Sequence, residues 1–204
     1  MLDLIRAASL ITFLGAAACA RGHSEAPATP AADSAAVPPA VEKPRVSTAP
    51  ADSPGPPAWL AVDSAQRTVT LSLETTAGPP GASALINGYR NGEARLVVPL
   101  GWTVKWNWRN ADSTSRHSLV VMTQREKIPL EGGRPPFSNA MTREVTTGLP
   151  PGGTDQTTFQ ADEAGWYWLL CGVPNHALSG EWIELRVDPD AETASLIRKT
   201  PSKP

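Results

Sequence analysis

The segment Trp102-Thr-Val-Lys-Trp-Asn-Trp-Arg109 alternates large apolar residues with polar ones. Alternation with a period of two is the pattern of a β-strand that buries one face. Asn91-Gly92 supplies a tight-turn signal, and residues 124–155, rich in Gly and Pro, predict a long crossing loop. Seven further segments read as strands: 68–74, 85–89, 94–99, 117–122, 157–161, 165–170 and 182–187. No long amphipathic helix is indicated, so the sequence predicts an all-β sandwich or barrel of about eight strands.

Residues 1–19 have the organisation of an export signal. The apolar run at 7–18 is shorter than the about 20 residues that a membrane-spanning helix needs, and it fits the apolar region of a secretory signal. The small residues Ala16-Ala17-Ala18 directly before Cys19 resemble a bacterial lipoprotein cleavage box, in which the cysteine becomes lipidated. The alternative is ordinary signal cleavage near Ala18 to Ala20. Either reading predicts an exported protein, and the first predicts one anchored to the membrane on its periplasmic or extracytoplasmic side.

The composition changes near residue 58. Residues 20–57 are rich in Ala, Pro, Ser and Thr and cannot bury enough apolar surface to fold, so they predict a disordered tether in which His23 is solvated. Eleven of the twelve aromatic residues follow this segment. We therefore expect a folded domain at 58–190, large enough to fold as a monomer, and a polar tail at 191–204.

Charge and cysteine content exclude several classes of protein. The formal net charge of -2 leaves no basic footprint for nucleic acid. With only Cys19 and Cys171, a disulfide framework and a four-cysteine zinc site are excluded.

The two histidines and the single cysteine of the predicted domain occupy positions that form one constellation. His117 opens a predicted strand, Cys171 ends another, and His176 follows five residues after Cys171 in a loop. Two imidazoles and one thiolate in a near-trigonal plane, with a weak axial donor, are the ligands of a blue-copper site. The alternative is a buried free cysteine, a common core residue, beside two incidental histidines.

Several motifs between Asn87 and Val187 resemble the cupredoxin family, and in particular its sulfocyanin and rusticyanin branch. They are Val98-Pro-Leu-Gly-Trp102, His117-Ser-Leu-Val, Ala164-Gly-Trp-Tyr167 with Phe159, and Cys171-Gly-Val-Pro-Asn-His176-Ala-Leu-Ser-Gly-Glu-Trp182. The resemblance implies a Greek-key β-sandwich in which His117, Cys171 and His176 hold one copper ion. It also implies that Ser118 and Asn175 support the ligand loop.

The sequence departs from the family pattern at the axial position. The pattern has methionine five residues after the second histidine, where this chain has Glu181. Alternation places Glu181 on the same side of its strand as Ile183, Leu185 and Val187, where a carboxylate is costly unless it is paired or binds metal. Glu181 is therefore either an axial ligand or a strand-end residue that reaches solvent. A third possibility is that the loss of the methionine marks a degenerate site or one that prefers another metal. As a ligand, Glu181 would favour Cu(II), which predicts a lower reduction potential than methionine gives.

The resemblance implies a one-electron carrier of the cell envelope rather than an enzyme, with redox proteins such as cytochromes or a terminal oxidase as partners. A multicopper oxidase would need more histidines than the two in the domain. Two alternatives remain. One is a copper-holding or copper-delivery protein. The other is a mononuclear copper site whose axial position is open or held by a carboxylate.

Overall fold

The computed structural model describes residues 56–199. The predicted signal peptide at 1–19, Cys19 and the tether up to residue 55 lie outside the described residues, as do residues 200–204, so the predictions made for them stay predictions. Within residues 56–199, no helix is long and apolar enough to cross a membrane.

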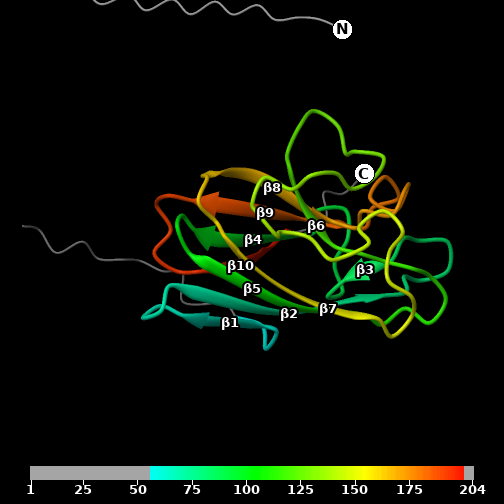
Figure 1. Cartoon of the computed structure of the whole chain (residues 1–204), viewed down its shortest axis with the longest axis horizontal. Coiled ribbons are helices and arrows are strands. Elements are labelled where there is room, and N and C mark those ends of the chain that lie inside the picture. Colours follow the sequence, from blue (N-terminus) through cyan, green and yellow to red (C-terminus); the bar gives the residue numbers. More distant parts are fainter. Residues whose placement is uncertain (1–55, 200–204) are drawn as a thin grey trace, which may run out of the picture. The chain divides into compact units, whose positions relative to one another are not determined.

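Within the described residues, ten strands form two sheets that pack as a sandwich (Figure 1). The first sheet contains β1 (Leu60–Asp63), β2 (Thr68–Thr76), β3 (Leu85–Ile86), β5 (Thr103–Asn110) and β7 (Thr154–Gln160). The second sheet follows the order β10 (Ser195–Arg198), β4 (Ala94–Pro99), β9 (Trp182–Asp188), β8 (Gly165–Leu170) and β6 (Val120–Thr123). Both sheets are mixed, because β2 runs parallel to β5 and β4 runs parallel to β9. The predicted all-β sandwich is confirmed.

Buried and exposed residues alternate along β5, as predicted from the sequence. Val104, Trp106 and Trp108 are each 1% exposed, whereas Lys105 and Arg109 are exposed. The tryptophans face the second sheet and form the centre of the main core. Burying an indole removes a large apolar surface from water, so this face supplies much of the stability of the sandwich.

The long segment between β6 and β7 also contributes to the core. Phe137 is 2% exposed, stacks on Phe159 of β7 at a centroid distance of 5.5 Å and lies 4.9 Å from the ring of Tyr167 of β8. This single aromatic side chain links the loop to both sheets. The segment is therefore a crossing loop as predicted, and its path over the domain is fixed by packing.

The extent of the folded domain differs from the prediction. Residues 195–198, assigned from sequence to a polar tail that starts at residue 191, form β10 and pair with β4 in the register Leu196↔Leu96. A strand of four residues offers little periodicity of its own, and its pairing with β4 decides its structure. The same reason explains why β1, which pairs with β2, was not predicted and why the number of strands exceeds eight.

The pairing of three strands brings the metal-ligand candidates together. β8 and β9 form a hairpin in the register Leu170↔Trp182, and β6 pairs with β8 in the register Val120↔Leu170. The chain just before β6 therefore lies beside the chain just after β8. These ends meet at the right-hand end of the sandwich in Figure 1, where the orange loop joins β8 to β9.

Replacing Trp106 with Ala tests the contribution of the β5 face. Removing a buried indole leaves a cavity, so we expect the free energy of unfolding, measured by urea denaturation, to fall by about 3–5 kcal/mol. Lys105→Ala, one residue away on the exposed face, should change it by less than about 0.5 kcal/mol. Equal effects of the two substitutions would contradict the assignment of the buried face.

Candidate metal site

Four potential metal ligands lie together at this end of the sandwich. One donor atom from each of His117, Cys171, His176 and Glu181 lies within 4.8 Å of all the others. His117 precedes β6 and is held to Leu149 by paired backbone hydrogen bonds of 3.2 and 2.7 Å. The other three residues belong to the β8–β9 hairpin: Cys171 follows β8, His176 lies in the loop and Glu181 precedes β9. Although residues 117–122 were predicted as a strand, β6 begins only at Val120.

Backbone hydrogen bonds hold the hairpin loop in one shape. The Cys171 N–H donates to the Glu181 carbonyl (3.1 Å), and the Glu181 N–H donates to the His176 carbonyl (3.1 Å). Gly180 has a φ of 112°, and a Cβ there would lie 2.2 Å from Oδ1 of Asn91. Glycine is thus required where the chain turns back toward β9.

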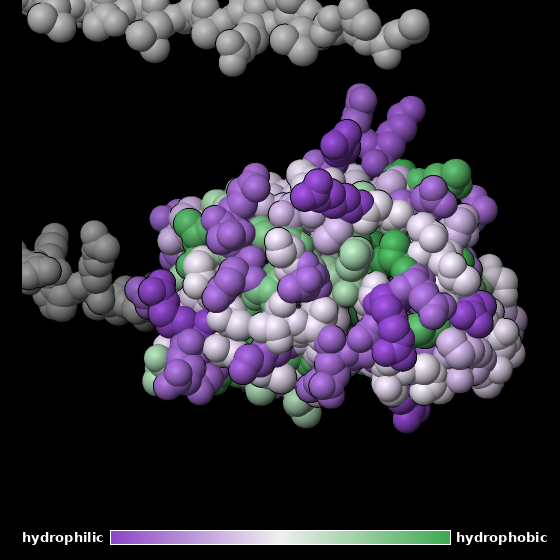
Figure 2. Space-filling model, viewed as in Figure 1, coloured by the Kyte–Doolittle hydropathy of each residue, from purple (hydrophilic) through white to green (hydrophobic). Residues whose placement is uncertain are grey.

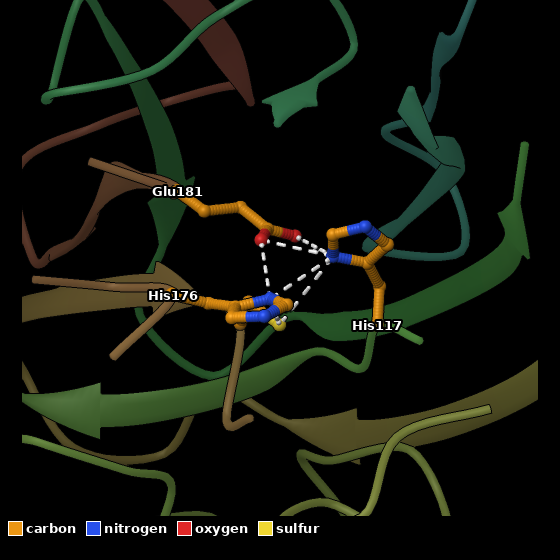
Figure 3. Close-up of side chains that lie close together, drawn as sticks. His117, His176 and Glu181 are labelled. Carbon is orange, nitrogen blue, oxygen red and sulfur yellow. Dashed lines mark hydrogen bonds and ion pairs between the residues drawn. The ribbon is translucent and has the colours of Figure 1, made fainter. Parts of the chain in front are cut away.

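The donor atoms of His117, His176 and Glu181 point toward one another (Figure 3), and the Cys171 sulfur lies close to both imidazoles. The two Nδ1 atoms of His117 and His176 are 3.3 Å apart. Oε2 of Glu181 lies 2.9 Å from Nδ1 of His117 and 3.1 Å from Nδ1 of His176. The sulfur of Cys171 lies 3.5 Å from Nδ1 of His176 and 3.9 Å from Nδ1 of His117.

Glu181 is buried, with 1% of its surface exposed. The alternation predicted for it is confirmed, because Ile183, Leu185 and Val187 are buried as well. The expectation that its carboxylate could reach solvent at the strand end is wrong. Its second oxygen, Oε1, lies 2.9 Å from Nδ1 of His117 but has no hydrogen-bond partner. A buried carboxylate oxygen without a donor is costly, and a metal ion would supply the missing partner.

The pKa values show how these groups act on one another. Burial, followed by the negative charge of Glu181, raises the pKa of the Cys171 thiol well above its ordinary value. Burial alone would lower the pKa of His117, but hydrogen bonds and charges from Glu181 and Asp112 outweigh burial and raise it. A thiolate and a carboxylate side by side in a buried site repel each other, so a cation between them would stabilise both.

The donor set therefore fits a mononuclear metal site. Bonds of about 2.0 Å to nitrogen and about 2.3 Å to sulfur, at near-tetrahedral angles, place the ligand atoms of one ion roughly 3.3–3.6 Å apart. The nitrogen and sulfur atoms of His117, His176 and Cys171 lie 3.3–3.9 Å apart, close to these values, and all four donors lie within 4.8 Å of one another. Two imidazoles, one thiolate and one weaker oxygen donor are compatible with copper.

Ser118 and Asn175 were both predicted to support the ligand loop. The Ser118 backbone N–H points at the Cys171 sulfur (3.4 Å), and its hydroxyl donates to the Val145 carbonyl (2.6 Å) and accepts from the Gly172 N–H (3.0 Å). Asn175 is exposed and acts through its backbone, whose N–H donates to the Leu130 carbonyl (2.8 Å). Ser118 thus contacts the ligand directly, whereas Asn175 shapes the loop in a left-handed conformation (φ 71°).

Asp112 is a further residue of the site that was not predicted from the sequence. This carboxylate is 5% exposed, and its Oδ2 lies 3.1 Å from Nε2 of His117, on the side of the ring away from the other donors. The signal in the sequence is weak, because the contact comes from a turn and has no periodicity. Only the run Asn110-Ala-Asp112-Ser-Thr114 after β5, typical of a side-chain-stabilised turn, pointed toward it.

A cavity of about 740 Å³ adjoins the cluster. Residues 77–84 form one wall, and the other wall includes Arg90 as well as the metal-ligand candidates His117, His176 and Glu181. Cys171 does not line it. Of the ligand candidates that line the cavity, only the His176 side chain is appreciably exposed, so the cavity reaches the cluster mainly along that imidazole, while the thiol is enclosed by protein.

Known proteins share this sequence pattern. A sequence model of the sulfocyanin (SoxE) domain family matches residues 56–196. Sulfocyanin from Sulfolobus acidocaldarius is 27% identical over 129 residues, which cover 60% of this chain and 64% of that protein. The chain thus matches just under two thirds of the length of this curated relative. The family match confirms the resemblance drawn from the motifs.

Solved structures also match the chain. The structure of rusticyanin from Thiobacillus ferrooxidans is 24% identical, covers 60% of this chain and 82% of its own, and gives a TM-score of 0.41. Reduced auracyanin from Roseiflexus castenholzii is 20% identical, covers 58% of this chain and 97% of its own, and gives a TM-score of 0.39.

Replacing Ser118 with Ala tests its support of the ligand loop. The Val145 carbonyl and the Gly172 N–H would each lose a hydrogen-bond partner, so we expect the free energy of unfolding in urea to fall by about 1–3 kcal/mol. Ser179→Ala is the matched control, because its hydroxyl makes one hydrogen bond, to the Asn175 carbonyl, at an exposed position. A loss at Ser118 no greater than at Ser179 would contradict the assigned role.

Proposed function

Because the chain belongs to the sulfocyanin (SoxE) domain family, we propose that it binds one copper ion and carries single electrons between other redox proteins. Members of this cupredoxin family are generally electron carriers rather than enzymes. The observation that carries the proposal is the buried cluster of His117, Cys171, His176 and Glu181. His117, Cys171 and His176 were expected as ligands from the sequence and its family resemblance, whereas Glu181 was left open between an axial ligand and a strand-end residue.

Bound copper would supply the one-electron couple between its +1 and +2 states. The protein holds the donor atoms in place in three ways. Paired backbone hydrogen bonds fix the residues around His117, the β8–β9 register fixes Cys171 opposite Glu181, and Ser118 joins the two segments. A frame that does not move when the charge changes keeps the reorganisation energy of electron transfer small.

The exposure of the His176 side chain supports the proposal that electrons pass between the site and a partner protein through this imidazole. This side chain is 29% exposed, while those of His117 and Glu181 are 3% and 1% exposed. Leu178 (53% exposed) follows it in the same loop, and Leu130 (55% exposed) is tied to that loop through Asn175. Leu130 and Leu178 are the most exposed of the large apolar residues that the structure describes, and the face in Figure 2 shows separate small green areas among polar ones. An apolar patch next to a ligand edge suits brief docking of a redox protein such as a cytochrome or a terminal oxidase.

The site of action that we propose is the cell envelope. An apolar segment followed by Ala16-Ala17-Ala18-Cys19 supports export and a lipid anchor at Cys19, and the Ala/Pro-rich residues 20–57 support a flexible tether. Such an arm would let the domain reach partners on the outer side of the membrane.

The cavity favours a second candidate function. Because its lining includes His176, His117 and Glu181, a small molecule could approach the site along the exposed edge of His176. A mononuclear copper site that binds an external ligand would use this access. In that case, adding azide to the copper-loaded protein would change its visible spectrum, whereas a site that serves only as an electron carrier would show no change.

Cu(II) titration of the full chain tests the proposed function. We expect an intense sulfur-to-copper absorption band that saturates at one copper per chain. Cys171→Ser should abolish the band, because it removes the thiolate, whereas Cys19→Ser should leave it intact. Absence of the band from the unsubstituted chain, or its persistence in Cys171→Ser, would overturn the proposal.

Replacing Glu181 with Met tests the carboxylate as a ligand. A neutral thioether stabilises Cu(II) less than an anionic oxygen does, so we expect the reduction potential to rise by about 59 mV for each tenfold loss of Cu(II) affinity relative to Cu(I). The absorption band should shift at the same time. Glu192→Met, which removes an exposed carboxylate, is the matched control. If the two variants have the same potential, Glu181 does not bind the metal.

A further inference from the structure

His117 lies between two carboxylates. Its Nδ1 faces Glu181 and the other candidate ligands, and its Nε2 faces Asp112 at 3.1 Å. The side chains of His117 and Asp112 are only 3% and 6% exposed, so this contact is shielded from water. Glu181 belongs to the candidate ligand set, whereas Asp112 lies on the far side of the ring and cannot share an ion held by Nδ1. The role of Asp112 must therefore be exerted through His117.

The turn after β5 holds Asp112 in one orientation. Its Oδ1 accepts hydrogen bonds from the Thr114 N–H and hydroxyl, both 2.7 Å, and from the Ser115 N–H at 3.3 Å. Its own N–H donates to Oδ1 of Asn110 and to the Thr75 carbonyl, each at 3.0 Å. With Oδ1 committed to the turn, Oδ2 is left for the histidine.

These contacts set the hydrogen-bond roles at His117. The Thr114 and Ser115 donors occupy Oδ1 of Asp112, and Oδ2 lies 3.1 Å from Nε2 of His117. A carboxylate oxygen accepts hydrogen bonds, so Nε2 is placed to donate to Asp112, and Nδ1 is left to face the other candidate ligands.

The second histidine has no such support. In the described residues, the polar side-chain contacts of His176 go through Nδ1, to Glu181, to Cys171 and to His117, and its ring is partly exposed. The two imidazoles of the site thus differ: one is backed by a buried anion, and the other has an edge facing solvent.

We propose that Asp112 is a positioning residue that holds His117 with Nδ1 toward the metal and makes the site favour Cu(II) over Cu(I). The inference rests on the proposed copper site. A hydrogen-bonded carboxylate makes the imidazole a stronger donor, and losing such a partner typically lowers metal affinity about 10–100-fold. Its negative charge adds to that of Glu181 and stabilises the more highly charged ion.

The test compares reduction potentials of the copper-loaded full chain. In Asp112→Asn the charge is lost and the amide can present N–H groups to Nε2, so we expect Cu(II) affinity to fall at least tenfold relative to Cu(I), which is a rise of about 59 mV. Asp112→Glu keeps the charge and should stay closer to the unsubstituted protein. Asp63→Asn is the matched control, because Asp63 is exposed and its Oδ1 also caps a turn, by accepting from the Gln66 N–H. A shift in Asp112→Asn no larger than in Asp63→Asn would overturn the proposal.

A second measurement does not depend on copper or on the folding of a variant. Nitrogen-15 NMR of the metal-free full chain, at a pH where the His117 ring is neutral, should show the proton on Nε2. A proton on Nδ1 would overturn the positioning role. If the chain takes up no copper but the ring carries its proton on Nε2, the proposed function fails while the contact between Asp112 and His117 stands.

Discussion

The metal-site end of this domain depends on two acidic side chains, those of Cys171 and Glu181, that are buried side by side. The register of the β8–β9 hairpin places Cys171 directly opposite Glu181, with a backbone hydrogen bond of 3.1 Å between them. Their side chains are almost fully enclosed, so the thiolate and the carboxylate cannot both be charged without a cation. The strand pairing that fixes β6 beside β8 then brings an imidazole to the same point. A sheet built for packing alone would have no reason to bury these groups together.

The two faces of the site have different physical roles. On the inner side, His117 is enclosed and backed by Asp112, so its orientation is set by protein contacts alone. On the outer side, His176 presents an edge to solvent beside exposed leucines. His117 thus keeps the site rigid, and His176 makes the site accessible from the surface. This division allows the site to remain fixed while still lying near the surface.

Much of the fold was predictable because the sequence signals were local. Alternation identified β5 and the buried side of β9, the spacing from Cys171 to His176 identified two hairpin donors, and the family pattern marked Glu181 as the candidate axial position. Asp112 was not predictable in the same way, because its contact with His117 depends on the path of a turn. β10 was missed for a related reason, since its pairing with β4 decides its conformation. Features set by periodicity or by spacing within one hairpin can be predicted from sequence, whereas those set by tertiary contact cannot.

Three of the four donors lie within residues 171–181 of one hairpin whose loop is closed by its own backbone hydrogen bonds. The spacing of these three donors is therefore set mainly by the number of residues between Cys171 and Glu181, and less by the rest of the sandwich. An insertion or deletion between Cys171 and Glu181 would separate groups that the rest of the sandwich cannot bring back together. Conversely, the whole segment could be exchanged as a unit between scaffolds that present a hairpin of the same register, provided that they supply a histidine beside its first residue.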